Sequence, residues 1–152
     1  MWRVVAMQND QRLVDTLIRH WRKRKGAEIM PIYEAFAPET LGPDIWQQCC
    51  AFTVQVLNQK PLLISDYTGS KACQAMGRDI TGEVLAIGAQ QFEAARLLQQ
   101  AEAVLDKKDA LTDEGHFVNA QSKIIKFRSC LLPFGRKEKV THLLLGVSWQ
   151  SF

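Results

Sequence analysis

The stretch 125–149, IKFRSCLLPFGRKEKVTHLLLGVSW, decides the fold of this chain. Apolar or small residues alternate with charged or polar ones over residues 125–131, and a second alternating run covers residues 141–149. A period of two is typical of a β-strand with one face on a core. The intervening Gly135-Arg136-Lys137-Glu138 predicts a turn. We therefore expect two antiparallel strands here, with a further strand near residues 116–120 before them.

Upstream of these strands, two more strands and a long helix are expected. Residues 45–57 are rich in β-branched and aromatic side chains, and residues 61–67 follow after a turn at 58–60, which predicts a hairpin. Residues 89–107 carry apolar side chains at helical spacing, and a short helix that ends at Gly77 is expected over residues 69–76. With an N-terminal amphipathic helix, this order predicts an α+β fold: a five-stranded antiparallel sheet with helices on one face.

The N-terminal helix is expected over residues 10–25, where one stripe is apolar and the last turn is basic. The stripe must be buried, either against the sheet of its own chain or against a second copy of the chain. In the second case Leu13, Leu17 and Trp21 form a dimer interface. We accordingly divide the chain into a helical cap or dimerisation segment, residues 1–29, and a domain over residues 30–152.

Length and composition set the class of protein. The 152 residues, 47% of them hydrophobic, are enough for one globular domain. The 19 cationic and 16 anionic side chains give a net charge of +3, and five of the cations lie between Arg19 and Lys25. The four cysteines have no disulfide or zinc spacing, and we find neither a secretory signal nor a membrane-spanning run. A cytoplasmic protein with reduced thiols is the expectation.

Sequence motifs for catalysis are missing. Gly77-Arg78-Asp79-Ile80-Thr81-Gly82 has part of the spacing of a phosphate-binding loop, but Glu83 and Val84 stand where a lysine and a hydroxyl are required. A helix cap at Gly77 followed by a local turn is the simpler interpretation. The histidines share no ligand spacing, and the adjacent Cys49 and Cys50 point to opposite faces of a strand. We therefore expect no metal site, no catalytic residues and a protein that is not an enzyme.

Several short motifs, spread in order along the chain, carry a family resemblance. They are His20-Trp21-Arg22, Met30-Pro31, Phe36 with Pro38, Leu41 with Pro43, the run from Gly69 to Gly82, Leu131-Leu132-Pro133, and Leu143-Leu144-Leu145-Gly146. Together the motifs resemble those of a bacterial subfamily of small, single-domain PAS-like sensory proteins. The resemblance implies a PAS fold and a sensory or protein-interaction module, often a homodimer through an N-terminal helix. Asp66 and Tyr33 depart from the pattern, because arginines are common at these positions.

The resemblance also implies a small pocket between the sheet and the helices. Its expected ligand-binding residues are Tyr67, Met76, Phe92, Phe127, Ser129 and Leu145. Cys73 lacks the sequence context of a photoreactive flavin site, and the helix expected over residues 89–107 has no histidine for haem. The identity of any cofactor is left open.

The main hypothesis is a non-enzymatic module that binds a small ligand or a partner protein and passes a signal to a separate protein. The alternative is a regulatory nucleic-acid-binding protein that contacts phosphates through the basic end of the first helix. Its contact residues would be Arg19, Arg22, Lys23, Arg24 and Lys25. A third option, a small enzyme, would use His142 or Asp66.

Overall fold

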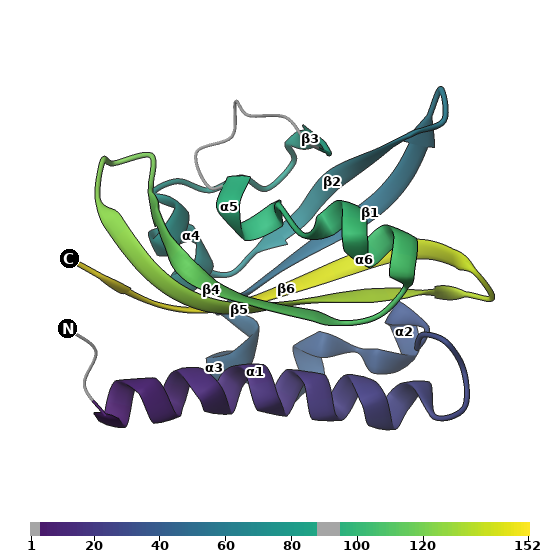
Figure 1. Cartoon of the computed structure of the whole chain (residues 1–152), viewed down its shortest axis with the longest axis horizontal. Coiled ribbons are helices and arrows are strands. Elements are labelled where there is room, and N and C mark those ends of the chain that lie inside the picture. The colour runs from purple at the N-terminus through teal and green to yellow at the C-terminus, as the bar shows by residue number, and fades with distance from the viewer. Residues whose placement is uncertain (1–3, 88–94) are drawn as a thin grey trace.

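The structure is a computed structural model that describes residues 4–87 and 95–152, with the side chains of the first helix described from Leu13 onward. Within these residues, strands form one antiparallel sheet that is flanked by helices (Figure 1). In chain order the elements are α1 (Val4–Lys25), α2 (Tyr33–Phe36), the 3-10 helix η1 (Pro38–Leu41), α3 (Pro43–Trp46), β1 (Cys49–Leu57), β2 (Lys60–Thr68), α4 (Ser70–Met76), β3 (Val84–Ala86), α5 (Ala95–Leu98), α6 (Ala101–Lys107), β4 (Leu111–Val118), β5 (Ile124–Arg136) and β6 (Lys139–Ser151).

The sheet has the strand order β3-β2-β1-β6-β5-β4. The predicted α+β fold with an antiparallel sheet is confirmed: β1 and β2 form a hairpin, and β6 lies between β1 and β5. The described residues contain six strands where five were expected, because β3 pairs with β2 at the edge of the sheet. A strand of three residues is too short to show a period of two, which is why it was not predicted.

The helices cover both faces of the sheet, which corrects the expectation that they gather on one. α1, α2 and α3 cover what we call the α1 face, and α4, α5 and α6 cover the opposite α4 face (Figure 1). The reason lies in consecutive apolar residues. Leu143 and Leu145 join the core of the α4 face, whereas Leu144 joins that of the α1 face. A strand that is apolar on both sides needs a layer on each.

Helix α1 is fixed at the centre of its face by Leu17 and Trp21. Leu17 Cδ1 fills the space in front of Gly146, where any added Cβ would collide with it. Trp21 Nε1 donates a hydrogen bond of 2.7 Å to the backbone oxygen of Pro133. Leu13, Leu17 and Trp21 are thus buried by their own chain. The expected dimer interface at these three residues is therefore wrong for this arrangement, because the sheet already occupies the stripe.

Some element boundaries differ from the prediction for local reasons. The continuous helix expected over residues 89–107 is divided into α5 and α6, and Gln100, with φ −91° and ψ 0°, interrupts it. Residues 89–94 of that prediction lie outside the described residues. Strand β1 begins at Cys49 because Pro43, which favours the first turn of a helix, starts α3.

The turn after α4 is as predicted. Gly77, with φ 83°, caps α4, and its N–H donates to the oxygen of Cys73. The carboxylate of Asp79 accepts a hydrogen bond of 3.0 Å from the backbone N–H of Thr81. The segment is therefore a structural turn that leads from α4 towards β3.

Candidate functional site

Four of the six expected pocket residues lie on the α4 face of the sheet. Met76, Phe127 and Leu145 are fully buried in its core. Ser129 is 3% exposed and lies between Phe127 and Leu131 on the same side of β5. The structure therefore brings these side chains to one layer between the sheet and α4–α6. Phe92 lies outside the described residues.

Tyr67 lies on the opposite, α1 face, and a β-bulge is the cause. Tyr67 pairs with Ala51, whereas the next pair along is Ser65 with Phe52, so Asp66 is an extra residue without a partner in the ladder. The extra residue reverses the alternation of β2. Tyr67 stacks on Trp46 at 4.0 Å between ring centroids, and its hydroxyl donates to the backbone oxygen of Trp46. A period of two in the sequence cannot reveal such a reversal.

A polar pair at the β4 end of the α4 face was missed by the sequence analysis. Arg96 of α5 donates through Nη2 to Oδ1 of Asp113 at 3.3 Å and to the backbone oxygen of Glu114 at 3.1 Å. Gly115 makes room for it, since an added Cβ would lie 2.9 Å from Arg96 Nη2. Ser129 is the register partner of Asp113 on the neighbouring strand. No signal in the sequence indicated this pair, because the strand expected near residues 116–120 did not reach Asp113, whereas β4 begins at Leu111.

The pair retains unused hydrogen-bonding capacity. Within the described residues, Arg96 Nε and Asp113 Oδ2 are buried atoms without a hydrogen-bond partner. A buried polar group left unsatisfied costs about 1–3 kcal/mol, so two of them in one ion pair require an explanation. One N–H donor and one carboxylate acceptor match a small ligand group that both accepts and donates, such as an amide or a hydroxyl. We take Arg96, Asp113 and Ser129 as the candidate site.

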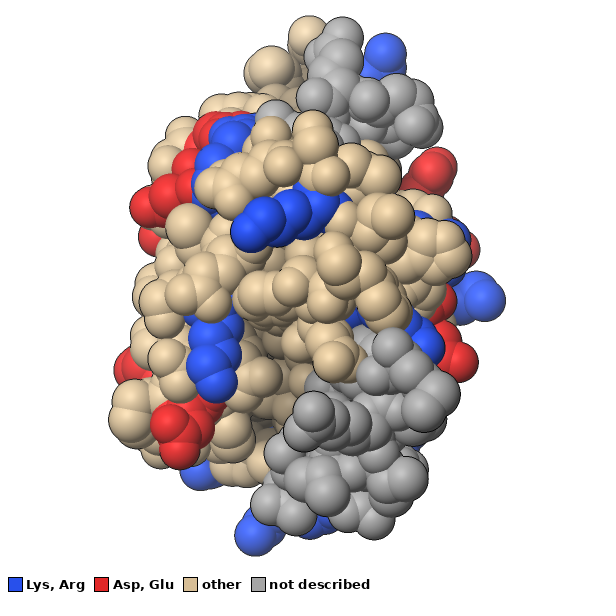
Figure 2. All heavy atoms as spheres, turned by 90° about the vertical axis from the view of Figure 1, so that its left-hand side faces the viewer, with Lys and Arg blue, Asp and Glu red and all other residues tan. Residues whose placement is uncertain are grey.

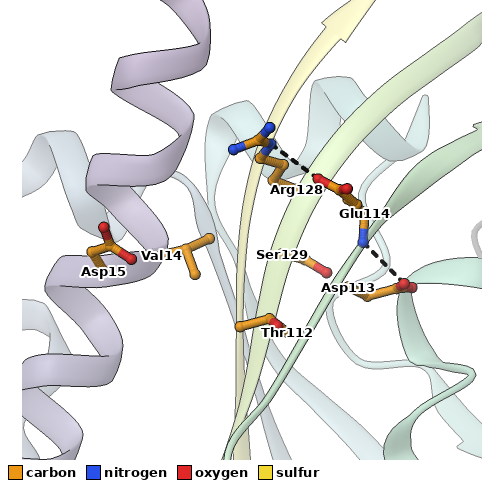
Figure 3. Close-up of a pocket in the computed structure, with 7 residues that line it drawn as sticks. All are labelled: Val14, Asp15, Thr112, Asp113, Glu114, Arg128 and Ser129. Carbon is orange, nitrogen blue, oxygen red and sulfur yellow. Dashed lines mark hydrogen bonds and ion pairs between the residues drawn. The ribbon is translucent and has the colours of Figure 1, made fainter.

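An open cleft lies on the other side of the same two strands. It has a volume of about 410 Å³ between α1 and the β4–β5 edge. Figure 3 shows Arg128 and Glu114 facing each other on the side of α1, whereas the side chains of Asp113 and Ser129 turn away from the helix. Arg128 Nε lies 3.2 Å from Glu114 Oε2. Asp113 and Ser129 line this cleft together with Glu114 and Arg128, so β4 contributes both to the candidate site and to the cleft beside α1.

The thiols have no redox or nucleophilic role that the structure supports. Burial raises the pKa of Cys130 to about 12, and burial also raises the pKa of Cys50 above its usual range. Both thiols stay protonated at neutral pH. Cys49 packs on the α1 face and Cys50 on the α4 face, as the sequence predicted for adjacent strand residues.

The side chains considered for catalysis lie on the α1 face, apart from the interior site. His142 stacks on Tyr33 at 4.5 Å between ring centroids. Asp66 is exposed and accepts a hydrogen bond from Thr53. Neither residue contacts Arg96 or Asp113 through any described hydrogen bond, and the described residues contain no group of three or more potential metal ligands.

Comparisons with known proteins give likenesses of fold alone. No protein-family profile and no curated protein matches the chain. A variant PAS-B domain of Cycle from Drosophila melanogaster, with bound glycerol, is similar at 11% identity and a TM-score of 0.46, over 67% of this chain and 98% of that one. The LOV protein of Rhodobacter sphaeroides is similar at 12% identity and a TM-score of 0.46, over 68% of this chain and 58% of that one. A PAS domain from Colwellia psychrerythraea is similar at 10% identity and a TM-score of 0.43, over 68% of this chain and 86% of that one.

Proposed function

We propose that this chain is a non-enzymatic PAS-like sensory module that binds a small molecule beside Arg96 and Asp113. The observation that carries the proposal is the unused hydrogen-bonding capacity of this pair, Arg96 Nε and Asp113 Oδ2. A ligand that satisfies both atoms gains binding energy that no side chain of the described structure now supplies. Met76, Phe127 and Leu145 are fully buried in the core of the same face, and they are proposed as the apolar part of the ligand site.

The signal would travel through β4. Within the described residues β4 is an edge strand that pairs only with β5, so fewer hydrogen bonds hold it than hold a central strand. A ligand that draws Asp113 away from Arg96 moves the backbone of β4. Because successive strand residues face opposite sides, the same movement shifts Glu114 relative to Arg128 in the cleft beside α1. Helix α1 is then the element that reports the ligand.

The remaining parts of the proposal concern partners and location. We also propose a homodimer, which the family resemblance implies, together with a cytoplasmic location and a separate output protein. With Leu17 and Trp21 occupied by the sheet, a second copy would have to contact other residues. In the described part of the chain, no helix has both the length and the apolar character needed to cross a membrane.

The test is native mass spectrometry of the protein purified from its own host, with two variants in parallel. Arg96→Met removes the donor, and Glu114→Gln is the matched control, because it changes a charge on the same strand outside the interior. We expect the wild type and Glu114→Gln to carry the same added mass and Arg96→Met to lack it. A wild-type protein without any added mass, or an Arg96→Met protein that keeps the mass, would contradict the proposed site.

A further inference from the structure

Two basic segments that lie far apart in the sequence meet at one end of the molecule. One is the last turn of α1, residues 22–25, and the other is the turn of the β5–β6 hairpin, residues 136–139. Trp21 donates to the oxygen of Pro133, and the N–H of Gly135 donates to the oxygen of Pro31 at 3.0 Å. These two bonds hold the end of the helix beside the hairpin, as Figure 1 shows on its right-hand side.

We call this surface the basic end. Its cationic residues are Arg22, Lys23, Arg24, Lys25, Arg136, Lys137 and Lys139. All except the half-buried Lys25 are exposed, and the acidic residues in or beside the two segments are Glu28 and Glu138. The rest of the chain has 12 cationic against 14 anionic side chains, so the basic end accounts for the whole positive balance.

No acidic side chain of the described structure neutralises the charges of the basic end. Among the described residues, none of its cations forms an ion pair; the one hydrogen bond from their side chains runs from Lys25 Nζ to the backbone oxygen of Glu28. The other end of the molecule differs, because Figure 2 shows lysine and arginine mixed there with acidic side chains on a mainly uncharged surface. The helix dipole accounts for some cations at the end of α1. It does not account for those of the hairpin, which belongs to a sheet.

An apolar residue lies at the junction of the two segments. Ile29 is 47% exposed in the connection between α1 and Pro31. A nucleic-acid phosphate backbone offers no apolar group for Ile29 to contact. This end of the described structure also has no exposed large aromatic side chain on which bases could stack. A single isoleucine is also too little apolar surface to hold a protein on a membrane. Cations around an exposed aliphatic side chain best match acidic side chains interspersed with apolar ones.

We propose that the basic end docks an acidic segment of a partner protein. The inference deepens the proposed function, on which it rests, because it gives the chemistry of the output partner. Arginine binds carboxylates through two parallel hydrogen bonds, and four arginine and lysine residues from α1 can act together with three from the hairpin. Trp21 and Leu17 connect α1 to the sheet. A movement of α1 therefore changes the position of the α1 segment of the basic end relative to its hairpin segment.

The experiment measures binding of a fluorescent peptide of repeated Glu-Glu-Leu-Gly units to the purified full-length chain by anisotropy at several salt concentrations. We expect the R22E/K23E variant and the R136E/K137E variant each to bind about tenfold more weakly, the equivalent of about 1.4 kcal/mol. The matched control is K71E/K123E, which reverses two exposed cations on α4 and the β4–β5 turn, at the opposite end of β5. The control should bind as the wild type does, and all variants should keep the wild-type circular dichroism spectrum.

Several results would overturn the docking surface. They are unchanged binding in R136E/K137E, equal weakening in the K71E/K123E control, or tighter binding of a single-stranded RNA or of phosphatidylserine vesicles than of the peptide at the same salt. The assay needs no small ligand, so it separates this inference from the sensory function. Peptide binding at the basic end by a protein that carries no added mass in native mass spectrometry would keep the docking surface and remove the ligand site.

Discussion

The two faces of the sheet are closed in different ways. On the α1 face a long helix inserts Leu17 in front of Gly146 and ties Trp21 to Pro133, so shape and hydrogen bonding match at the centre of the contact. On the α4 face three short helices cover the sheet, and a charged pair beneath α5 keeps two atoms without partners. Both faces bury an apolar core, so the difference lies in how each face is closed, and the proposed ligand site belongs to the α4 face.

The largest expected effect is on the α1 face. Leu17→Ala removes a fully buried side chain and leaves a cavity over Gly146, and we expect it to lower the free energy of unfolding by about 2–5 kcal/mol. Urea denaturation followed by circular dichroism measures this. Leu98→Ala in α5, where the side chain is only partly buried, is the comparison on the other face and should cost less. Equal losses at the two positions would contradict the division between the faces.

The sequence predicted the strands of the sheet but not that helices cover both of its faces. Alternation in residues 125–131 and 141–149 was sufficient for the strands, since the β5–β6 register is unbroken over residues 125–131 and 142–149. The same pattern could not show that both faces are covered, because runs such as Leu143-Leu144-Leu145 were counted for one face only. Layers are a property of how distant elements pack, which a local period does not contain.

The candidate site was still harder to predict. Met76, Phe127, Ser129 and Leu145, which the family resemblance implied as ligand-binding residues, lie in one layer of the structure, and their role in binding stays a prediction. Arg96 and Asp113 come from two elements 17 residues apart, and their pairing depends on the space left by Gly115. Tyr67 was misplaced because one extra residue reverses the strand. Bulges and close approaches depend on three-dimensional contacts that the sequence alone does not display.

A second prediction concerns Gly146. In Gly146→Ala the new methyl group collides with Leu17, and we expect a loss of about 1–3 kcal/mol of stability, the usual cost of overpacking a core. Combining it with Leu17→Ala should give a smaller loss than the sum of the two single variants, because the methyl group enters the space that leucine vacates. Additive losses in urea denaturation would show that the two residues do not meet.

The third prediction is that substitutions of the polar pair on the α4 face, unlike those on the α1 face, do not lower stability. Replacing both members of the polar pair, as in Arg96→Met with Asp113→Leu, should leave stability unchanged or raise it by about 1 kcal/mol, since apolar residues often replace a partly buried ion pair without loss. The same double variant should lose the bound mass in native mass spectrometry. Asp113→Leu alone should be less stable than the double variant, because it leaves the guanidinium without its carboxylate. If the double variant is destabilised as strongly as Leu17→Ala, the Arg96–Asp113 pair serves to stabilise the fold, which would contradict this prediction.

The smallest expected effect is a pH dependence on the α1 face. Burial, together with Arg24 and Lys23, lowers the pKa of His20 from its usual 6.5, and its Nε2 has no hydrogen-bond partner. The unfolded chain therefore binds this proton more readily than the folded chain, so stability is complete above pH 6.5 and falls as the pH drops through the window below it. Urea denaturation of the wild type and His20→Asn at a series of pH values measures the difference. The wild type should lose more stability than the variant between neutral and mildly acidic pH, and parallel curves would show that His20 is equally solvated in both states. Since His20 lies one residue before Trp21, the loss should appear as weaker attachment of α1, and the α4 face should keep its ligand over the same range.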